Sequence, residues 1–150
     1  MQRTHFETEH NMFRESFRAF LLKEVLPHQE AWEEAGMVSR EVWLKAGEQG
    51  FLLPWAEEEY GGLGLTDFRY EQIMCEELAR INEAGFMIPL HSALCGPYIA
   101  EYGNAEQKAR LMPGIIRGET ILAVAMTEPG AGSDLAGMRT TAVDKGDHWE

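Results

Sequence analysis

Cysteine is scarce in this sequence, which contains only Cys75 and Cys95. Two cysteines do not make a disulfide framework, and their separation matches no metal-binding motif. Both lie in segments with helical patterning, so we expect two buried free thiols. The five histidines are scattered, and no pair is spaced i, i+4 around a glutamate. These absences predict a protein without a metal site.

Long apolar runs are also missing. No stretch approaches the roughly 18 apolar residues that a membrane-spanning helix needs. The N-terminus, MQRTHFETEH, is polar and mildly acidic, so it resembles neither a signal peptide nor an arginine-rich transit sequence. We therefore expect no membrane partner, and a chain that resides in a bacterial cytoplasm or has already been processed.

Basic residues are few, with 13 lysines and arginines against 25 acids and a net charge of −12. Nucleic acids and anionic membranes both attract basic surfaces, so neither is expected as a main partner. Length and composition, with 150 residues of which 45% are hydrophobic, fit a globular protein with a real core.

What the sequence does contain is a series of helical patterns. Thr8 is a candidate N-cap for a first helix, which Pro27 should kink or stop and which should end by Gly36. Ser39 is the expected cap of a short second helix. The first helix carries apolar residues at helical spacing: Phe13, Phe17, Phe20, Leu21 and Val25.

Further helices are expected after a glycine-rich loop at residues 51–66. Asp67 should restart the helix, and residues 90–102 keep an apolar stripe that is typical of a helix buried between others. Asn104 and Gln107 form a capping pair for the next helix. Pro113 should open one more turn, which Gly118 closes.

The pattern changes after residue 118. Residues 121–126 form a short apolar run that suits a buried strand, TTAV alternates as a second strand, and DKGD is a hairpin turn signal. The return strand has only three residues before the chain stops. We therefore expect a mainly α protein, with a helical domain over residues 1–118 and the incomplete start of a β domain over residues 119–150.

The segment TEPGAGSD follows the first predicted strand. Gly130 and Gly132 can take positive φ values, so successive backbone N–H groups can form an anion-binding nest, to which Ser133 and Thr127 add hydroxyls. The segment is neither a P-loop nor a dinucleotide-binding G-x-G-x-x-G. The acids Glu128 and Asp134 oppose phosphate binding unless they point away. On local grounds alone, a plain turn without a ligand remains the alternative.

The stretch AMTEPGAGSD resembles the first signature of the acyl-CoA dehydrogenase flavoproteins. The resemblance covers almost the whole chain: residues 50–64 are similar to the family pattern G.LLP..EEYGG.G, and YGNAEQKARLMPGIIRGE matches the stretch before its sheet. The family's proline before EEYGG is replaced in this chain, near Ala56 and Glu57. The resemblance implies a helical bundle followed by the family's middle β domain.

The resemblance also implies an FAD site. Backbone groups of Val124, Ala125 and Met126 would meet the flavin's pyrimidine edge, and the Thr127 hydroxyl would bond to the ring system. The pyrophosphate would lie against the loop formed by Gly130, Gly132 and Ser133. Ser133 would also touch the acyl-CoA, and Leu94 and Tyr98 would line the acyl channel, although such stripes also occur as plain core.

The family reaction is α,β-dehydrogenation of an acyl-CoA, in which a glutamate removes the α-proton, the β-hydride goes to the flavin, and an electron-transferring flavoprotein takes the electrons. That glutamate lies in the family's C-terminal domain, so no catalytic residue is expected here and the fragment alone should be inactive. The full-length protein is expected to be a homo-oligomer, in a bacterial cytoplasm or a mitochondrial matrix. Two alternatives stay open: an acyl-CoA oxidase or reduced-flavin monooxygenase on this scaffold, and a non-enzymatic helical interaction module.

Overall fold

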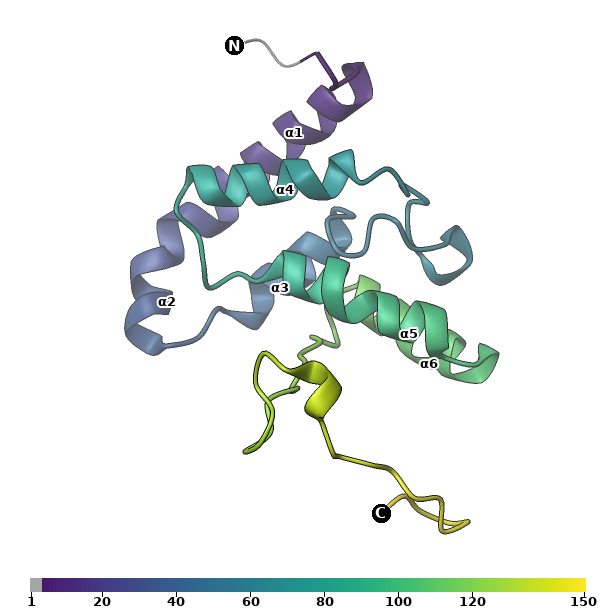
Figure 1. Cartoon of the computed structure of the whole chain (residues 1–150). Coiled ribbons are helices and arrows are strands. Elements are labelled where there is room, and N and C mark those ends of the chain that lie inside the picture. The colour runs from purple at the N-terminus through teal and green to yellow at the C-terminus, as the bar shows by residue number, and fades with distance from the viewer. Residues whose placement is uncertain (1–3) are drawn as a thin grey trace.

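The computed structural model describes residues 4–150, and residues 1–3 of the polar N-terminus lie outside this range. The described part is mainly helical, and its helices pack together while residues 121–150 extend away from them (Figure 1). The helical segments in chain order are α1 (Thr8–Phe20), η1 (Leu21–Val25), η2 (Leu26–His28), α2 (Gln29–Ala35), α3 (Arg40–Glu48), η3 (Glu58–Tyr60), α4 (Arg69–Arg80), η4 (Leu90–Cys95), α5 (Gly96–Tyr102), α6 (Ala105–Ile116) and η5 (Leu135–Gly137).

The N-cap of the first helix lies one residue earlier than predicted. Glu7, not Thr8, is the N-cap, and its backbone N–H donates to His10 Nδ1 at 3.2 Å. The Glu7 side chain accepts in turn from the backbone N–H of His10, so the two residues form a reciprocal capping box in which Glu7 takes the role that we expected of Thr8. Pro27 does not stop the helix: the chain passes through π-helical η1 and 3₁₀-helical η2 into α2, which ends at Gly36 with φ of 66°.

The later helix caps agree with the sequence. Ser39 caps α3 by accepting from the Glu41 N–H at 3.1 Å, and Asn104 and Gln107 form a reciprocal capping box on α6. Pro113 does not open a separate turn but lies inside α6. The helix loses only the hydrogen bond that a proline cannot donate, since the Pro113 carbonyl still accepts from the Arg117 N–H at 3.1 Å.

The core lies where α1, α3, α4 and α6 meet the loop after α3. Aromatic rings fill its centre, with Phe17 4.9 Å from Phe51 and Trp43 4.8 Å from Phe86 between ring centroids. Backbones approach closely beside it: a Cβ on Gly118 would overlap the Trp43 carbonyl, and one on Gly47 would overlap the Arg117 backbone. The end of α6 is therefore held directly against α3.

The predicted strands do not form. Residues 121–126 and the TTAV stretch have no regular secondary structure, and the pairing in residues 119–150 consists of two isolated bridges, Glu128 with Ala131 and Asp144 with Trp149. A strand needs a neighbouring strand to accept its ladder bonds. None lies beside residues 121–126 in the described chain, and in the TTAV stretch only Val143 is paired, exchanging backbone hydrogen bonds of 2.9 and 3.1 Å with Glu150. The DKGD turn is present, since the N–H of Lys145 donates to the His148 carbonyl at 3.0 Å.

The sequence also predicts the burial of the two thiols and the length of the helices. Cys95 is buried, whereas Cys75 is exposed on α4, so only one of the two thiols is buried as predicted. The sequence correctly places Cys75 on a helix, but it does not show that Cys75 lies on the exposed face of that helix. In residues 4–150, every helix is too short or too polar to cross a bilayer.

Candidate functional site

The segment predicted to face a cofactor leaves the helical body just after α6. Ile121 and Leu122 pack partly buried against the core, and residues 123–127 are exposed. Val124 and Met126 are 38% and 37% exposed, so this apolar stretch lies open on the surface of the described chain. Within residues 4–150, no backbone N–H or carbonyl of residues 123–127 has a hydrogen-bond partner.

A tight turn follows Thr127. Glu128 and Ala131 exchange two backbone hydrogen bonds of 3.0 and 3.2 Å, with Pro129 and Gly130 at the corner. Proline is favoured at the first corner position of such turns because its φ is already fixed near the required value. Ala131 is buried, while Thr127, Gly132 and Ser133 are exposed.

The predicted nest geometry is wrong in one respect. Gly130 and Gly132 do not adopt positive φ, unlike Gly118 and Gly146 elsewhere in the chain. A Cβ on either loop glycine would meet no atom within 4 Å. Neither the backbone conformation nor the packing of the described residues requires glycine at these two positions. Close approach of a ligand to the backbone is a remaining physical reason for glycine there.

Free backbone donors are nevertheless present in the loop. The N–H groups of Gly132, Ser133 and Asp134 are consecutive, and none donates a hydrogen bond to any part of the chain from residue 4 to residue 150. Exposed consecutive amides with a neighbouring hydroxyl are donors of the kind that oxygen-rich groups accept. The donor set therefore fits a pyrophosphate, and the unpaired residues 123–127 fit the polar edge of a ring.

The two acids beside the loop, Glu128 and Asp134, both contact the chain that follows the loop. Glu128 turns its carboxylate toward the following chain, where it accepts from the N–H groups of Arg139 and Thr140, both at 2.9 Å. These hydrogen bonds from Thr140 and Arg139 lower the pKa of Glu128. The Asp134 carboxylate lies against Gly137, where an added Cβ would come within 2.6 Å of Oδ2. Both acids thus have neighbours on the downstream chain.

Leu94 and Tyr98 lie one helical turn apart on η4 and α5. They are 40% and 50% exposed, and Tyr98 contacts the ring of Tyr102 at 6.2 Å between centroids. No hydrogen bond or ring contact in the described chain joins either residue to residues 123–133. The structure thus shows an exposed apolar strip on this helix, and it does not itself bring the strip and the loop into contact.

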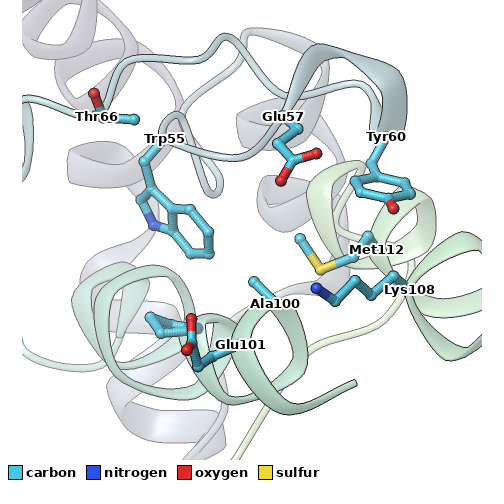
Figure 2. A pocket seen from close by; sticks show the side chains of 9 residues that line it. Trp55, Glu57, Tyr60, Thr66, Ala100, Glu101, Lys108 and Met112 are labelled. Carbon is cyan, nitrogen blue, oxygen red and sulfur yellow. The ribbon is translucent and has the colours of Figure 1, made fainter. Parts of the chain in front are cut away.

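A cavity of about 370 Å³ lies between the loop after α3 and helices α5 and α6. Figure 2 shows Trp55 and Tyr60 on one side of the cavity, with Lys108 and Met112 facing them from α6. None of residues 121–133 lines this cavity. It is therefore separate from the segment that was predicted to hold a cofactor.

Two buried acids on α4 were not foreseen. The Glu77 side chain is 1% exposed, and its carboxylate accepts hydrogen bonds from Arg14 and Arg18. Glu71 is also buried, and both its carboxylate oxygens lack a partner in residues 4–150. Burial raises the pKa of Glu71 to about 7. The helical spacing places Glu77 in the stripe that α4 buries, but its partners on α1 are distant in sequence and no local pattern indicates them.

One group of metal-ligand residue types occurs at the start of α1. Ligand atoms of Glu7, Glu9 and His10 lie within 4.8 Å of one another. His10 Nδ1 already accepts from the Glu7 N–H, and Nε2 lies 3.4 Å from Asp67 Oδ2. These contacts give His10 a structural role at the helix start. That the chain lacks a metal site stays a prediction.

Comparison with known proteins gives concordant matches. The family model described as "Acyl-CoA dehydrogenase, N-terminal domain" matches residues 7–119. The mitochondrial long-chain specific acyl-CoA dehydrogenase of Mus musculus is 49% identical over 144 residues, which are 96% of this chain and 33% of that protein. The chain thus spans about a third of the curated relatives it matches.

Solved structures agree in fold. An acyl-CoA dehydrogenase from Geobacillus kaustophilus superposes with a TM-score of 0.91 and 48% identity, covering 99% of this chain and 39% of its own. An acyl-CoA dehydrogenase from Bacillus anthracis, solved in complex with FAD, gives a TM-score of 0.84 and 35% identity, covering 95% of this chain and 25% of its own.

Proposed function

Because this chain belongs to the acyl-CoA dehydrogenase family, we propose that it forms the N-terminal part of a flavin-dependent enzyme that dehydrogenates acyl-CoA thioesters between their α and β carbons. The observation that carries the proposal is the exposed loop behind Thr127. It presents the consecutive unpaired amides of residues 132–134, in a chain whose relatives include an FAD complex.

The loop would hold FAD through groups that the chain leaves unpaired. Backbone groups of Val124, Ala125 and Met126 would bond to the polar edge of the flavin, and the Thr127 hydroxyl to its ring system. The pyrophosphate would lie against Gly130, Gly132 and Ser133, where missing side chains permit close approach. When bound, FAD supplies the acceptor for the hydride that leaves the β carbon.

The substrate would lie beside the same loop. Ser133 would bond to the acyl-CoA as well as face the pyrophosphate, and the exposed apolar strip of Leu94 and Tyr98 would cover part of the acyl chain. Apolar contacts of this kind exclude water and orient a flexible chain without fixing its length. Preference among acyl-chain lengths therefore depends on residues that complete the channel.

The base that removes the α-proton is expected outside this chain. Glu77 is unsuited to the role, because bonds from Arg18 and Arg14 outweigh the effect of burial and hold its pKa at about 2. Glu71 has a pKa nearer neutrality, but it does not line the cavity between α5, α6 and the loop after α3. We infer that a glutamate of the remaining domains acts as base.

The domain organisation follows from the same proposal. We infer that residues 1–118 form the helical domain and that residues 119–150 begin a middle β domain, whose other strands would pair with residues 121–126. The unpaired backbone of this segment supports the inference. We further propose a homo-oligomeric full-length protein that passes electrons to an electron-transferring flavoprotein, in a bacterial cytoplasm or a mitochondrial matrix.

Turnover by the full-length protein tests the function. Purified protein would be mixed with saturated acyl-CoAs of several lengths and an artificial electron acceptor, and formation of the α,β-unsaturated product would be measured. We expect product in stoichiometry with reduced acceptor. Reduction of the acceptor without an unsaturated product would contradict dehydrogenase activity. Rapid oxygen consumption in place of acceptor reduction would also contradict it.

A further inference from the structure

His91 joins three separate parts of the fold through its two ring nitrogens. It lies on η4 and is completely buried. Its Nε2 is 3.2 Å from the Ile115 carbonyl of α6, and its Nδ1 accepts from the backbone N–H of Leu122 at 3.1 Å. The imidazole therefore connects η4, the last turn of α6 and the segment that follows it.

The two partners determine the protonation state of the ring. A carbonyl oxygen can only accept, so Nε2 must carry hydrogen, and a backbone N–H can only donate, so Nδ1 must be bare. His91 is therefore neutral and held in one tautomer. Burial lowers the pKa of His91, which favours the neutral ring, although the bond to the Ile115 carbonyl acts in the opposite direction. The ring also contacts Trp43 edge-on at 5.3 Å, which restricts its rotation.

Leu122 is the last fixed point of the backbone before the loop. Upstream, Arg40 donates to the Glu119 carbonyl at 2.6 Å, and the N–H groups of Glu119 and Thr120 donate to the Gly114 carbonyl. Downstream, the next N–H with a partner in residues 4–150 is that of Glu128, which bonds within its own turn. The His91–Leu122 bond thus fixes where the chain leaves the helical body.

We propose that His91 is a positioning residue for the flavin-facing segment, and that its Nδ1 fixes the backbone at Leu122, two residues before Val124. This proposal rests on the proposed function, in which residues 124–133 hold FAD. Because His91 is completely buried, its effect on the cofactor would be indirect, through the backbone of Leu122.

Two substitutions separate the two bonds of the ring. In His91→Asn, the amide oxygen lies near the place of Nδ1 and can accept from the Leu122 N–H, while the bond to Ile115 is lost. In His91→Gln, the longer amide reaches the place of Nε2 and can donate to the Ile115 carbonyl, while the acceptor for Leu122 is lost. Both variants bury a neutral amide, so they match in polarity.

Amide hydrogen exchange at Leu122 and FAD affinity would be measured for the full-length protein and both variants. Losing one hydrogen bond changes a local equilibrium by on the order of tenfold. We expect His91→Gln to speed exchange at Leu122 and to weaken FAD binding, each by about that factor. In His91→Asn, both the exchange rate and the FAD affinity should stay close to those of the parent protein. Equal behaviour of the two variants would overturn the proposal.

The ring itself offers a test that needs no variant. Nitrogen NMR of the parent protein should show His91 with hydrogen on Nε2 and a bare Nδ1, and the opposite tautomer would overturn the proposal. Faster exchange at Leu122 in His91→Gln with unchanged FAD affinity would also overturn it. If a bulky residue at Ser133 then leaves FAD binding intact as well, the proposed flavin site has failed; if that residue abolishes binding, only the role of His91 has failed.

Discussion

Arg18 donates two hydrogen bonds to Glu77, from Nε to Oε2 at 2.7 Å and from Nη2 to Oε1 at 2.9 Å. Arg14 adds a third at 2.8 Å, and Arg80 lies 3.3 Å away. The pair joins α1 to α4, which lie side by side in Figure 1. Since the Glu77 carboxylate is 1% exposed, its charge depends on these arginines for compensation.

Replacing Glu77 by glutamine should destabilise the helical body strongly. The substitution keeps the shape of the side chain but leaves the arginines without their buried counter-charge, at a cost of about 3 kcal/mol. Chemical denaturation near pH 7 measures this loss. Glu119→Gln is the matched control, because Glu119 pairs with Arg117 at the surface. A control variant as unstable as Glu77→Gln would contradict the special role of the buried pair.

The effect of Glu77 on stability should also depend on pH. Burial raises its pKa, but the hydrogen bonds from Arg18 and Arg14 prevail and lower it to about 2. A carboxyl with a depressed folded pKa stabilises the fold above its unfolded pKa, near 4.5, and loses that contribution as pH falls toward 2. The stability difference between parent and Glu77→Gln should therefore shrink across this range, and a constant difference would contradict the assignment.

Glu71 should show the opposite pH dependence. Burial without a partner raises its pKa to about 7, so the folded state takes up a proton that the unfolded state has released between about pH 4.5 and 7. Glu71→Gln should match the parent near pH 4 and be more stable at pH 8, by up to about 3 kcal/mol. Unfolding midpoints across this range measure it, with Glu30→Gln on the exposed face of α2 as control. A difference independent of pH would show that folding does not raise the pKa of Glu71.

Residues 1–150 alone should not dehydrogenate acyl-CoA. The loop offers donors for FAD, but the described residues provide no free glutamate beside it that could remove the α-proton. The isolated chain would be assayed with FAD, an acyl-CoA and an artificial acceptor, against free FAD as background. Turnover above that background would mean that the base lies within these residues.

The features that the sequence predicts well are local ones. Ser39 and the pair Asn104 and Gln107 cap their helices as expected, because capping needs only residues three or fewer positions apart. The helical spacing of Phe17 and Phe20 likewise places both in the core. Such patterns depend on the geometry of one helix and not on its neighbours.

The features that the sequence misses depend on distant segments. The strand expected over residues 121–126 has the right composition, yet strand formation needs a partner that the described chain does not place beside it. Glu77 looks like a solvated glutamate until Arg14 and Arg18 approach from a helix about sixty residues earlier. His91 gives no signal at all, because its partners are two backbone groups at residues 115 and 122.

Retention of FAD by the full-length protein carrying Ser133→Trp tests the central claim most directly, with Ser16→Trp, on the exposed side of α1, as the matched control. An indole at Ser133 would block close approach to the free amides of residues 132–134. The account predicts that the Ser133 variant purifies largely without flavin absorbance while the Ser16 variant keeps it. Equal flavin content in both variants, with both folded, would contradict the claim.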